Sequence, residues 1–395
     1  MSPVSPVRIA GAAAHFGRDL DWCLARIAKL VGDARDAGAA LLVLPDATLG
    51  GYLADLRHPD PEALPPALDP DDPILGKVAA LAGEMVVCVG YCEADGDARY
   101  NAAACLHGDG VLGRHRKVHL PAGETAAYRA GDAFTAFDTP VGRLGMLIDY
   151  DKTFPESARS LALAGAEILA CLSAWPASIT NQAPRMSQDR QSRLFDLYDC
   201  ARAAENQVVV VSSNQTGAMG GMRFLGQAKV VGPAGNILAR TWAKAGLAVA
   251  EVAVAAELAR ARRVLSHLDE RRPDAYKLGH AAERGPGGYP PGNVAERRPS
   301  ADPLGHAGER DPGAYTLGHV AERHPGTDPL GHLGERRPDA GEPGGDVERR
   351  PGADPLGHLD ERRLGAGEPG GHVGGRHAGA DPLGDAGERD PGAYP

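Results

Sequence analysis

The fold is decided by residues 142–165, which read Gly142-Arg-Leu-Gly-Met-Leu-Ile-Asp-Tyr-Asp-Lys-Thr-Phe-Pro-Glu-Ser-Ala-Arg-Ser-Leu-Ala-Leu-Ala-Gly165. The first part, residues 142–149, is a short apolar run that closes on Asp149, and this pattern predicts a buried strand ending at a polar residue. The second part, residues 155–165, has the apolar periodicity of an amphipathic helix. A strand followed directly by a helix is typical of α/β proteins.

Two further candidate residues occupy the same kind of position. Asp46 follows the apolar run at residues 40–44, and Lys117 follows a strand predicted at residues 110–115. Functional sites in α/β sheets form at the carboxyl ends of strands. Asp46, Lys117 and Asp149 are therefore candidate site residues, although a polar residue at one strand end is more often a cap or a solvated group.

In the rest of the chain predicted strands alternate with predicted helices and hairpins, which indicates mixed sheets covered by helices. The predicted strands are residues 7–13, 40–44, 85–92, 99–106, 110–115, 142–149, 166–172, 208–214, 224–231, 237–241 and 247–252. The predicted helices are residues 19–37, 73–83, 155–165 and 188–206.

Several segments, in the right order, resemble motifs of the carbon–nitrogen hydrolase (nitrilase) superfamily, and together they span about residues 5–277. The resemblance implies a four-layer αββα sandwich that packs into a homodimer or a higher homo-oligomer. It also implies a Glu–Lys–Cys triad that acts on amides or nitriles. The segments are Leu41–Tyr52, Arg116–Pro121, Gly145–Glu156, Leu161–Glu167, Ala201–Asn206, Phe224–Gly226, Gly232–Gly235 and Arg271–Pro273.

Two of the three triad positions depart from the family pattern. The resemblance places Asp46 at the position of the base, Lys117 at the lysine and Asp149 at the position of the nucleophilic cysteine. It places a second functional glutamate at Glu124 and an oxyanion-binding N–H at Tyr150. A carboxylate that attacked an amide would have to form a mixed anhydride, so we do not expect the covalent mechanism of the family to operate here.

The replacements leave two functions open. Two aspartates beside one lysine should keep that lysine charged and raise each other's pKa. One aspartate would then act as a general base and the other, or Lys117, as an acid, in hydrolysis, hydration, elimination or cyclisation of a small amide, nitrile or carbamoyl compound. The alternative is a catalytically inactive protein that keeps the fold and serves as a binding or scaffold protein.

Other residues near the motifs are weaker candidates. Lys152 stands where carbamoylase-like relatives carry an arginine that binds a substrate carboxylate, which suggests an anionic substrate; a solvent-facing lysine is the competing interpretation. Trp175 and Arg185 are expected on the loop that covers the pocket. Cys171 has an apolar context and is expected to be a core residue rather than a displaced nucleophile.

Composition excludes several classes of partner. The formal net charge of −10 argues against nucleic acid, because phosphate binding needs a basic surface. No apolar run approaches the roughly 20 residues needed to cross a bilayer, and the N-terminal residues lack the pattern of a signal peptide. With six cysteines that lack CxxC spacing, we expect reduced thiols, no metal, no cofactor and a cytoplasmic location.

The last 115 residues differ from the rest of the chain. Residues 281–395 contain 26 of the 52 glycines and 16 of the 32 prolines, and Asp-Pro-Leu-Gly recurs at 302, 328, 354 and 381. We expect a domain at residues 1–280 and a disordered tail of 13-residue repeats at residues 281–395, because so few apolar residues cannot offset the entropy of ordering. Weak metal binding by the periodic histidines is the alternative.

Overall fold

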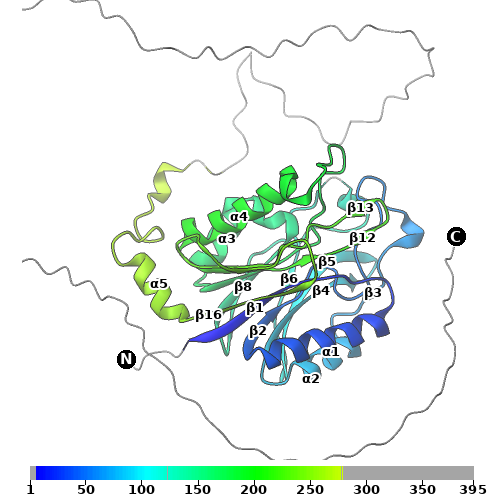
Figure 1. The fold of residues 1–395 in the computed structure, drawn as a ribbon, viewed down its shortest axis with the longest axis horizontal. Helices are drawn as coiled ribbons and strands as arrows, with labels where there is room; N and C mark the ends of the chain where they lie inside the picture. Colours follow the sequence, from blue (N-terminus) through cyan, green and yellow to red (C-terminus); the bar gives the residue numbers. More distant parts are fainter. Residues whose placement is uncertain (1–5, 122, 277, 279–395) are drawn as a thin grey trace, which may run out of the picture. The chain divides into compact units, whose positions relative to one another are not determined.

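Two β-sheets packed face to face, each covered by a pair of helices, form the architecture of this chain (Figure 1). The computed structural model describes residues 6–121, 123–276 and 278, all of which belong to the first of two units, Met1–Leu304. The predicted four-layer αββα sandwich is confirmed; the predicted tail at residues 281–395 lies outside the described residues. The helices are α1 (Leu20–Asp36), α2 (Pro73–Ala82), α3 (Pro155–Leu163), α4 (Arg190–Asn206) and α5 (Val254–Arg262).

The first sheet has the strand order β11-β1-β2-β4-β5-β6, and in addition β16 pairs with β1 and β3 pairs with β4. Strands β1, β2 and β4 are parallel, whereas β5 and β6 continue the sheet as antiparallel neighbours. The bounds are β1 (Val7–Ala14), β2 (Ala39–Val43), β3 (Ala67–Leu68), β4 (Val86–Asp95), β5 (Ala98–His107), β6 (Gly110–Arg116), β11 (Asn214–Gln215) and β16 (Gly246–Val252).

The second sheet has the strand order β15-β14-β10-β9-β8-β7. Strands β8, β9 and β10 at its centre are parallel, and the outer strands are antiparallel to their neighbours. The bounds are β7 (Ala136–Thr139), β8 (Gly142–Ile148), β9 (Ile168–Leu172), β10 (Val209–Ser212), β14 (Lys229–Val231) and β15 (Ile237–Arg240), while β12 (Ala218–Met219) and β13 (Met222–Arg223) form a separate pair.

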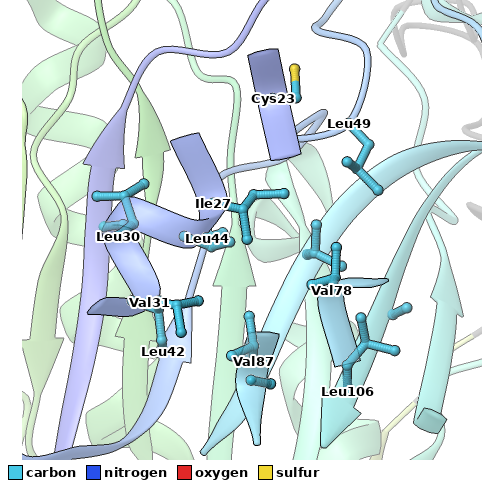
Figure 2. Packing of buried hydrophobic residues seen from close by; sticks show 14 of the residues in the cluster. Cys23, Ile27, Leu30, Val31, Leu42, Leu44, Leu49, Val78, Val87 and Leu106 are labelled. Atoms are coloured by element: carbon cyan, nitrogen blue, oxygen red, sulfur yellow. The ribbon is translucent and has the colours of Figure 1, made fainter. Parts of the chain in front are cut away.

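Three apolar clusters fill the spaces between the four layers. Successive side chains of a strand point to opposite faces, so Leu42 and Val87 pack against the helices while their neighbours Leu41 and Cys88 face the second sheet. Figure 2 shows the core between the first sheet and helices α1 and α2, a cluster that includes Leu42 and Val87 of the sheet and Ile27 of α1. The third cluster lies between the second sheet and helices α3 and α4.

Capping aspartates fix where the helices begin. The side chains of Asp19, Asp72 and Asp189 accept hydrogen bonds from backbone N–H groups in the first turns of α1, α2 and α4. Such caps satisfy donors that the helix leaves unpaired. The start of α2 at Asp72-Pro73 is therefore as the sequence predicts.

The predicted strand at residues 224–231 is wrong over its first half. Gly226 and Gln227 have φ angles of 67° and 64°, a left-handed conformation that is incompatible with a continuous strand. Strand β14 consequently begins only at Lys229. Helix α5 and strand β7 were not predicted. None of the helices in the described part of the chain is long and apolar enough to cross a membrane.

The close approach of β4 to the loop after β2 depends on Gly90. A Cβ atom at Gly90 would lie 2.6 Å from the backbone nitrogen of Ala47 and 2.8 Å from the Cα atom of Asp46. Such distances would require the backbone to move, so the position of Asp46 depends on the absence of a side chain at residue 90.

We predict that Gly90→Ala lowers the free energy of unfolding by about 1–3 kcal/mol, because overpacking here displaces backbone rather than a flexible side chain. The matched control is Gly76→Ala in α2, where an added Cβ meets no atom within 4 Å and the gain in helix propensity should raise stability by about 0.5–1 kcal/mol. Urea denaturation measures both variants. Equal stability of Gly90→Ala and the parent would contradict the close approach.

Candidate active site

The structure brings Asp46, Lys117, Glu124 and Asp149 into one buried cluster. Asp46 follows β2, Lys117 follows β6, Asp149 follows β8, and Glu124 opens a short 3₁₀ turn. The Lys117 Nζ atom lies 2.8 Å from Glu124 Oε1 and 3.3 Å from Asp149 Oδ2. All four residues are 6% exposed or less, so the groups interact in a region largely closed to solvent.

Asp149 occupies a sharp turn between strand and helix. Its φ angle is 50°, a conformation that is uncommon for a residue other than glycine and that is found at functional sites. The 3₁₀ turn Asp149–Thr153 leads directly into α3. Tyr150, the predicted oxyanion-binding residue, lies in this turn with a half-buried side chain.

Asp151 holds this turn against the loop that carries Lys117. Its Oδ1 atom accepts hydrogen bonds from the backbone N–H groups of Val118 and His119, at 3.2 and 2.9 Å, and its Oδ2 atom accepts one from Ile148 at 3.2 Å. Burial alone would raise the pKa of Asp151, but hydrogen bonds from His115 and His119 hold it well below its ordinary value. This role could not be predicted from the sequence, because Val118 and His119 lie 33 and 32 residues away from Asp151 in the chain.

Asp46 is a buried carboxyl group with a strongly altered pKa. Burial raises the pKa of Asp46 to about 7, with contributions from the nearby Asp149 and Glu124 carboxylates, while Lys117 acts in the opposite direction. Asn101, which the sequence did not single out, donates from Nδ2 to Asp46 Oδ2 at 2.9 Å. Asp46 therefore titrates near neutral pH.

Glu124 fixes Lys117 and is itself held by a tyrosine. The Tyr52 hydroxyl donates to Glu124 Oε1, the same oxygen that accepts from Lys117. Burial would lower the pKa of Lys117, but the carboxylates of Glu124, Asp149 and Asp46 outweigh it and raise the pKa. Lys117 is thus a fixed ammonium group, as expected for a lysine between acidic residues. Tyr52 was also missed as a site residue.

The charges of the cluster are not balanced. Three carboxyl groups face one ammonium group, and each carboxyl has one buried oxygen without a hydrogen-bond partner among the described residues. Uncompensated buried charge is costly, which is why the cluster retains a proton. The combination of a proton with a pKa near 7, a fixed cation and a second carboxylate suits acid–base chemistry at neutral pH.

The structure contradicts the interpretation of Lys152 as a solvent-facing lysine. Its side chain is fully buried, with Nζ 2.7 Å from Asp199 Oδ1 and 3.3 Å from the centre of the Phe195 ring. Burial lowers the pKa of Lys152. Asp199 also pairs with Lys229 at 2.8 Å, so Lys152 joins the turn to α4 and lends no support to an anionic substrate.

The remaining candidates are Trp175, Arg185 and Cys171. Trp175 is 8% exposed and donates from its backbone to Asn214 at 2.8 Å. Arg185 is exposed before a short 3₁₀ turn. Cys171 is buried in the core between β9 and the outer helices, and burial raises the pKa of its thiol to about 12, as expected for an inert core residue. Over the described residues, His, Cys, Asp and Glu side chains form no group suited to a metal ion.

We predict that Asp46→Asn stabilises the protein at pH 8 more than at pH 5. Because the folded-state pKa of Asp46 is raised to about 7, the folded protein holds this proton more tightly than the unfolded chain, and the parent loses stability as the pH rises from about 4 to 7. Asparagine is neutral throughout, so the variant escapes a loss on the order of 2–4 kcal/mol.

Thermal unfolding at both pH values measures the effect, with Asp97→Asn in the exposed β4–β5 turn as control. A stability difference for Asp46→Asn that stays constant from pH 5 to pH 8 would contradict the raised pKa.

Comparison with known proteins places this chain in a family. The model of the family described as carbon-nitrogen hydrolase matches residues 8–262. A nitrilase from Pyrococcus abyssi is 33% identical over 213 residues, which are 53% of this chain and 75% of that protein. An N-carbamoylputrescine amidase from Arabidopsis thaliana is 28% identical over 278 residues, which are 66% of this chain and 90% of that protein.

Solved structures of other proteins have the same fold as this chain. A carbon-nitrogen hydrolase from Helicobacter pylori G27 is similar with a TM-score of 0.60 at 24% identity, over 69% of this chain and 97% of that chain. A mutant of the Nesterenkonia AN1 amidase is similar with a TM-score of 0.55 at 25% identity, over 69% and 96% of the two chains. Because the family model covers more than half of the sequence, the protein belongs to the carbon–nitrogen hydrolase family.

Proposed function

We propose that the protein hydrolyses a C–N bond of a small amide or carbamoyl compound by direct attack of water, without a covalent acyl intermediate. The observation that carries this proposal is the cluster of Asp46, whose pKa is raised to about 7, with Asp149, which forms an ion pair with the fixed Lys117 ammonium group. A carboxyl group that titrates near neutral pH beside a second carboxyl group and a fixed cation is suited to acid–base catalysis.

A thioester mechanism does not fit these residues. In a mutant of the amidase from Nesterenkonia sp. AN1, the acetamide moiety of fluoroacetamide adds covalently at the active site cysteine. The sequence resemblance places Asp149 at the position of the family cysteine, and the thiol of Cys171 lies in a core cluster with a raised pKa. An anhydride formed on Asp149 would be much less stable than a thioester, so attack by water is the simpler path.

The proposed steps assign one task to each group. Asp149 accepts a proton from water as the water oxygen bonds to the carbonyl carbon. Lys117 and the backbone N–H of Tyr150 stabilise the negative oxygen that develops. Asp46 then gives its proton to the departing nitrogen as the C–N bond breaks, which yields a carboxylic acid and an amine. Transfer of the proton from Asp149 back to Asp46 restores the starting state.

The substrate class follows from the relatives. Their names include N-carbamoylputrescine amidase and (R)-stereoselective amidase, which favours small amides and carbamoyl compounds. A homo-oligomer and a cytoplasmic location remain part of the proposal.

We expect the parent to release amine or ammonia from at least one compound in a panel of amides, carbamoyl compounds and nitriles. Asp149→Asn and Lys117→Ala should each lower kcat/KM at least about 100-fold, the scale of a lost general base or oxyanion donor. Since Asp46 must carry its proton, kcat/KM for a neutral amide should fall above about pH 7. Asp97→Asn serves as the control, and full turnover by Asp149→Asn would refute the proposal.

Turnover in H₂¹⁸O separates direct attack from a covalent intermediate. With direct attack, ¹⁸O enters the product and the peptide that contains Asp149 keeps its mass after many turnovers. An anhydride that water opens at the carboxyl carbon of Asp149 would transfer ¹⁸O into that carboxylate, and one that water opens at the substrate carbon would appear as an acyl adduct on the same peptide after acid quenching during turnover; mass spectrometry detects both. Labelled or acylated Asp149 would therefore overturn the mechanism but not the hydrolase function.

The alternative function is binding without catalysis, and the replacement of the nucleophile by Asp149 is the observation that favours it. It predicts an inactive parent and the appearance of amidase activity in Asp149→Cys, because the rest of the site would then still be competent. Activity in the parent excludes it.

A further inference from the structure

The buried site contains more hydrogen-bond acceptors than its own donors satisfy. Asp46 Oδ1, Glu124 Oε2 and Asp149 Oδ1 are buried and have no donor within the described part of the chain, and the buried hydroxyl of Ser173 has no partner there either. Ser173 borders the cluster, since its carbonyl accepts from the backbone N–H of Asp46 at 3.2 Å. Buried polar atoms in folded proteins are nearly always paired, so these atoms indicate a bound group that supplies donors.

The net negative charge of the site also indicates a bound group that supplies positive charge or donors. Lys117 is the ammonium group that faces the three carboxyl groups, and with all of them ionised the cluster would carry a formal charge of −2. With a neutral thiol in place of Asp149, the formal charge of the cluster would be −1. The second negative charge must be neutralised by a proton or by a cation, because the region is closed to solvent.

We propose that this site binds a planar N–C–N cation, an amidinium or a guanidinium, more tightly than a neutral amide and hydrolyses it as a further substrate. The inference rests on the proposed hydrolysis of a C–N bond and extends its substrate class. An amidinium carries four N–H donors and a guanidinium carries more, with no acceptor, and both form paired hydrogen bonds with carboxylates. A neutral amide brings two N–H donors and an oxygen that itself needs donors.

The reaction balances with the residues present. Water adds through its oxygen to the central carbon of the amidinium, and Asp149 accepts one water proton. One C–N bond then breaks as Asp149 returns this proton to the departing nitrogen. Asp46 accepts the hydroxyl proton and passes it to the released ammonia. An amidinium and water thus give an amide and an ammonium ion, with no oxidant, reductant or other reactant.

Binding of such a cation should depend on pH through Asp46. The groups that face Asp46 are Lys117, Asp149 and Glu124, together with the neutral hydroxyls of Tyr52 and Tyr128. A cation favours the ionised form of Asp46, so its affinity should rise with pH. For one proton with a pKa of about 7, the affinity should increase about tenfold between pH 6 and pH 8 and then level off.

Isothermal titration calorimetry of the full-length protein tests this inference with two pairs of isosteric probes, acetamidine against acetamide and guanidine hydrochloride against urea. At pH 8 each cation should bind at least about tenfold more tightly than its neutral partner, and each should bind about tenfold more weakly at pH 6. Equal affinity within a pair, no binding of either cation, or an affinity independent of pH would overturn the inference.

Variants identify the groups responsible. Asp149→Asn should abolish the preference for cations, and Asp46→Asn should abolish its pH dependence, while Asp97→Asn should preserve both; thermal unfolding confirms that each variant is folded. If Asp149→Asn fails to fold, the pH dependence in Asp46→Asn decides the question. Persistence of both properties in the two site variants would overturn the inference.

Ammonia release distinguishes the two proposals. Cation binding without turnover of any compound would refute the proposed hydrolase function and the amidinium reaction, but not the preference of the site for a cation. Turnover of acetamide without a preference for acetamidine would refute the inference of a cationic substrate alone.

Discussion

The arrangement of the site depends on the carboxylate of Asp151. It lies after a strand of the second sheet, and it accepts backbone hydrogen bonds from Val118 and His119, which follow a strand of the first sheet. Lys117 belongs to the loop that carries Val118 and His119, and Asp149 belongs to the turn that carries Asp151. One buried side chain therefore keeps Lys117 and Asp149 in contact. These hydrogen bonds add to the Lys117–Asp149 ion pair and to the hydrogen bond from the Asp46 N–H group to the Ser173 carbonyl, and such directed contacts constrain position more than apolar packing does.

This constraint explains how a cluster with unbalanced charge persists. Isolated buried carboxylates would be expelled to solvent or protonated, and the fold opposes expulsion by giving these carboxylates buried hydrogen-bond partners. Asp46 is held by Asn101 from β5, and Glu124 is held by Tyr52. What remains free to adjust is protonation, and the raised pKa of Asp46 is the result. The carboxyl group of Asp149 thus adds to the negative charge that raises the pKa of Asp46.

Much of the fold could be predicted from the sequence, because strands with apolar runs and helices with capping aspartates are specified locally. The candidate cluster could be predicted in part, since Asp46, Lys117 and Asp149 each follow a strand. Asn101, Tyr52 and Asp151 could not, because their partners come from other elements. Lys152 was misjudged for the same reason: a lysine is normally exposed, and only the distant Asp199 and Lys229 make its burial possible.

The hydrogen bonds of Asp151 have a consequence for spectroscopy. The amides of Ile148, Val118 and His119 donate to a carboxylate rather than to a backbone carbonyl. Charge-assisted bonds of this kind shift amide proton resonances and slow hydrogen exchange. These three amides, which flank Asp149 and Lys117 in sequence, therefore provide an internal probe of whether the two sheets keep their alignment while the site changes its protonation or its ligand.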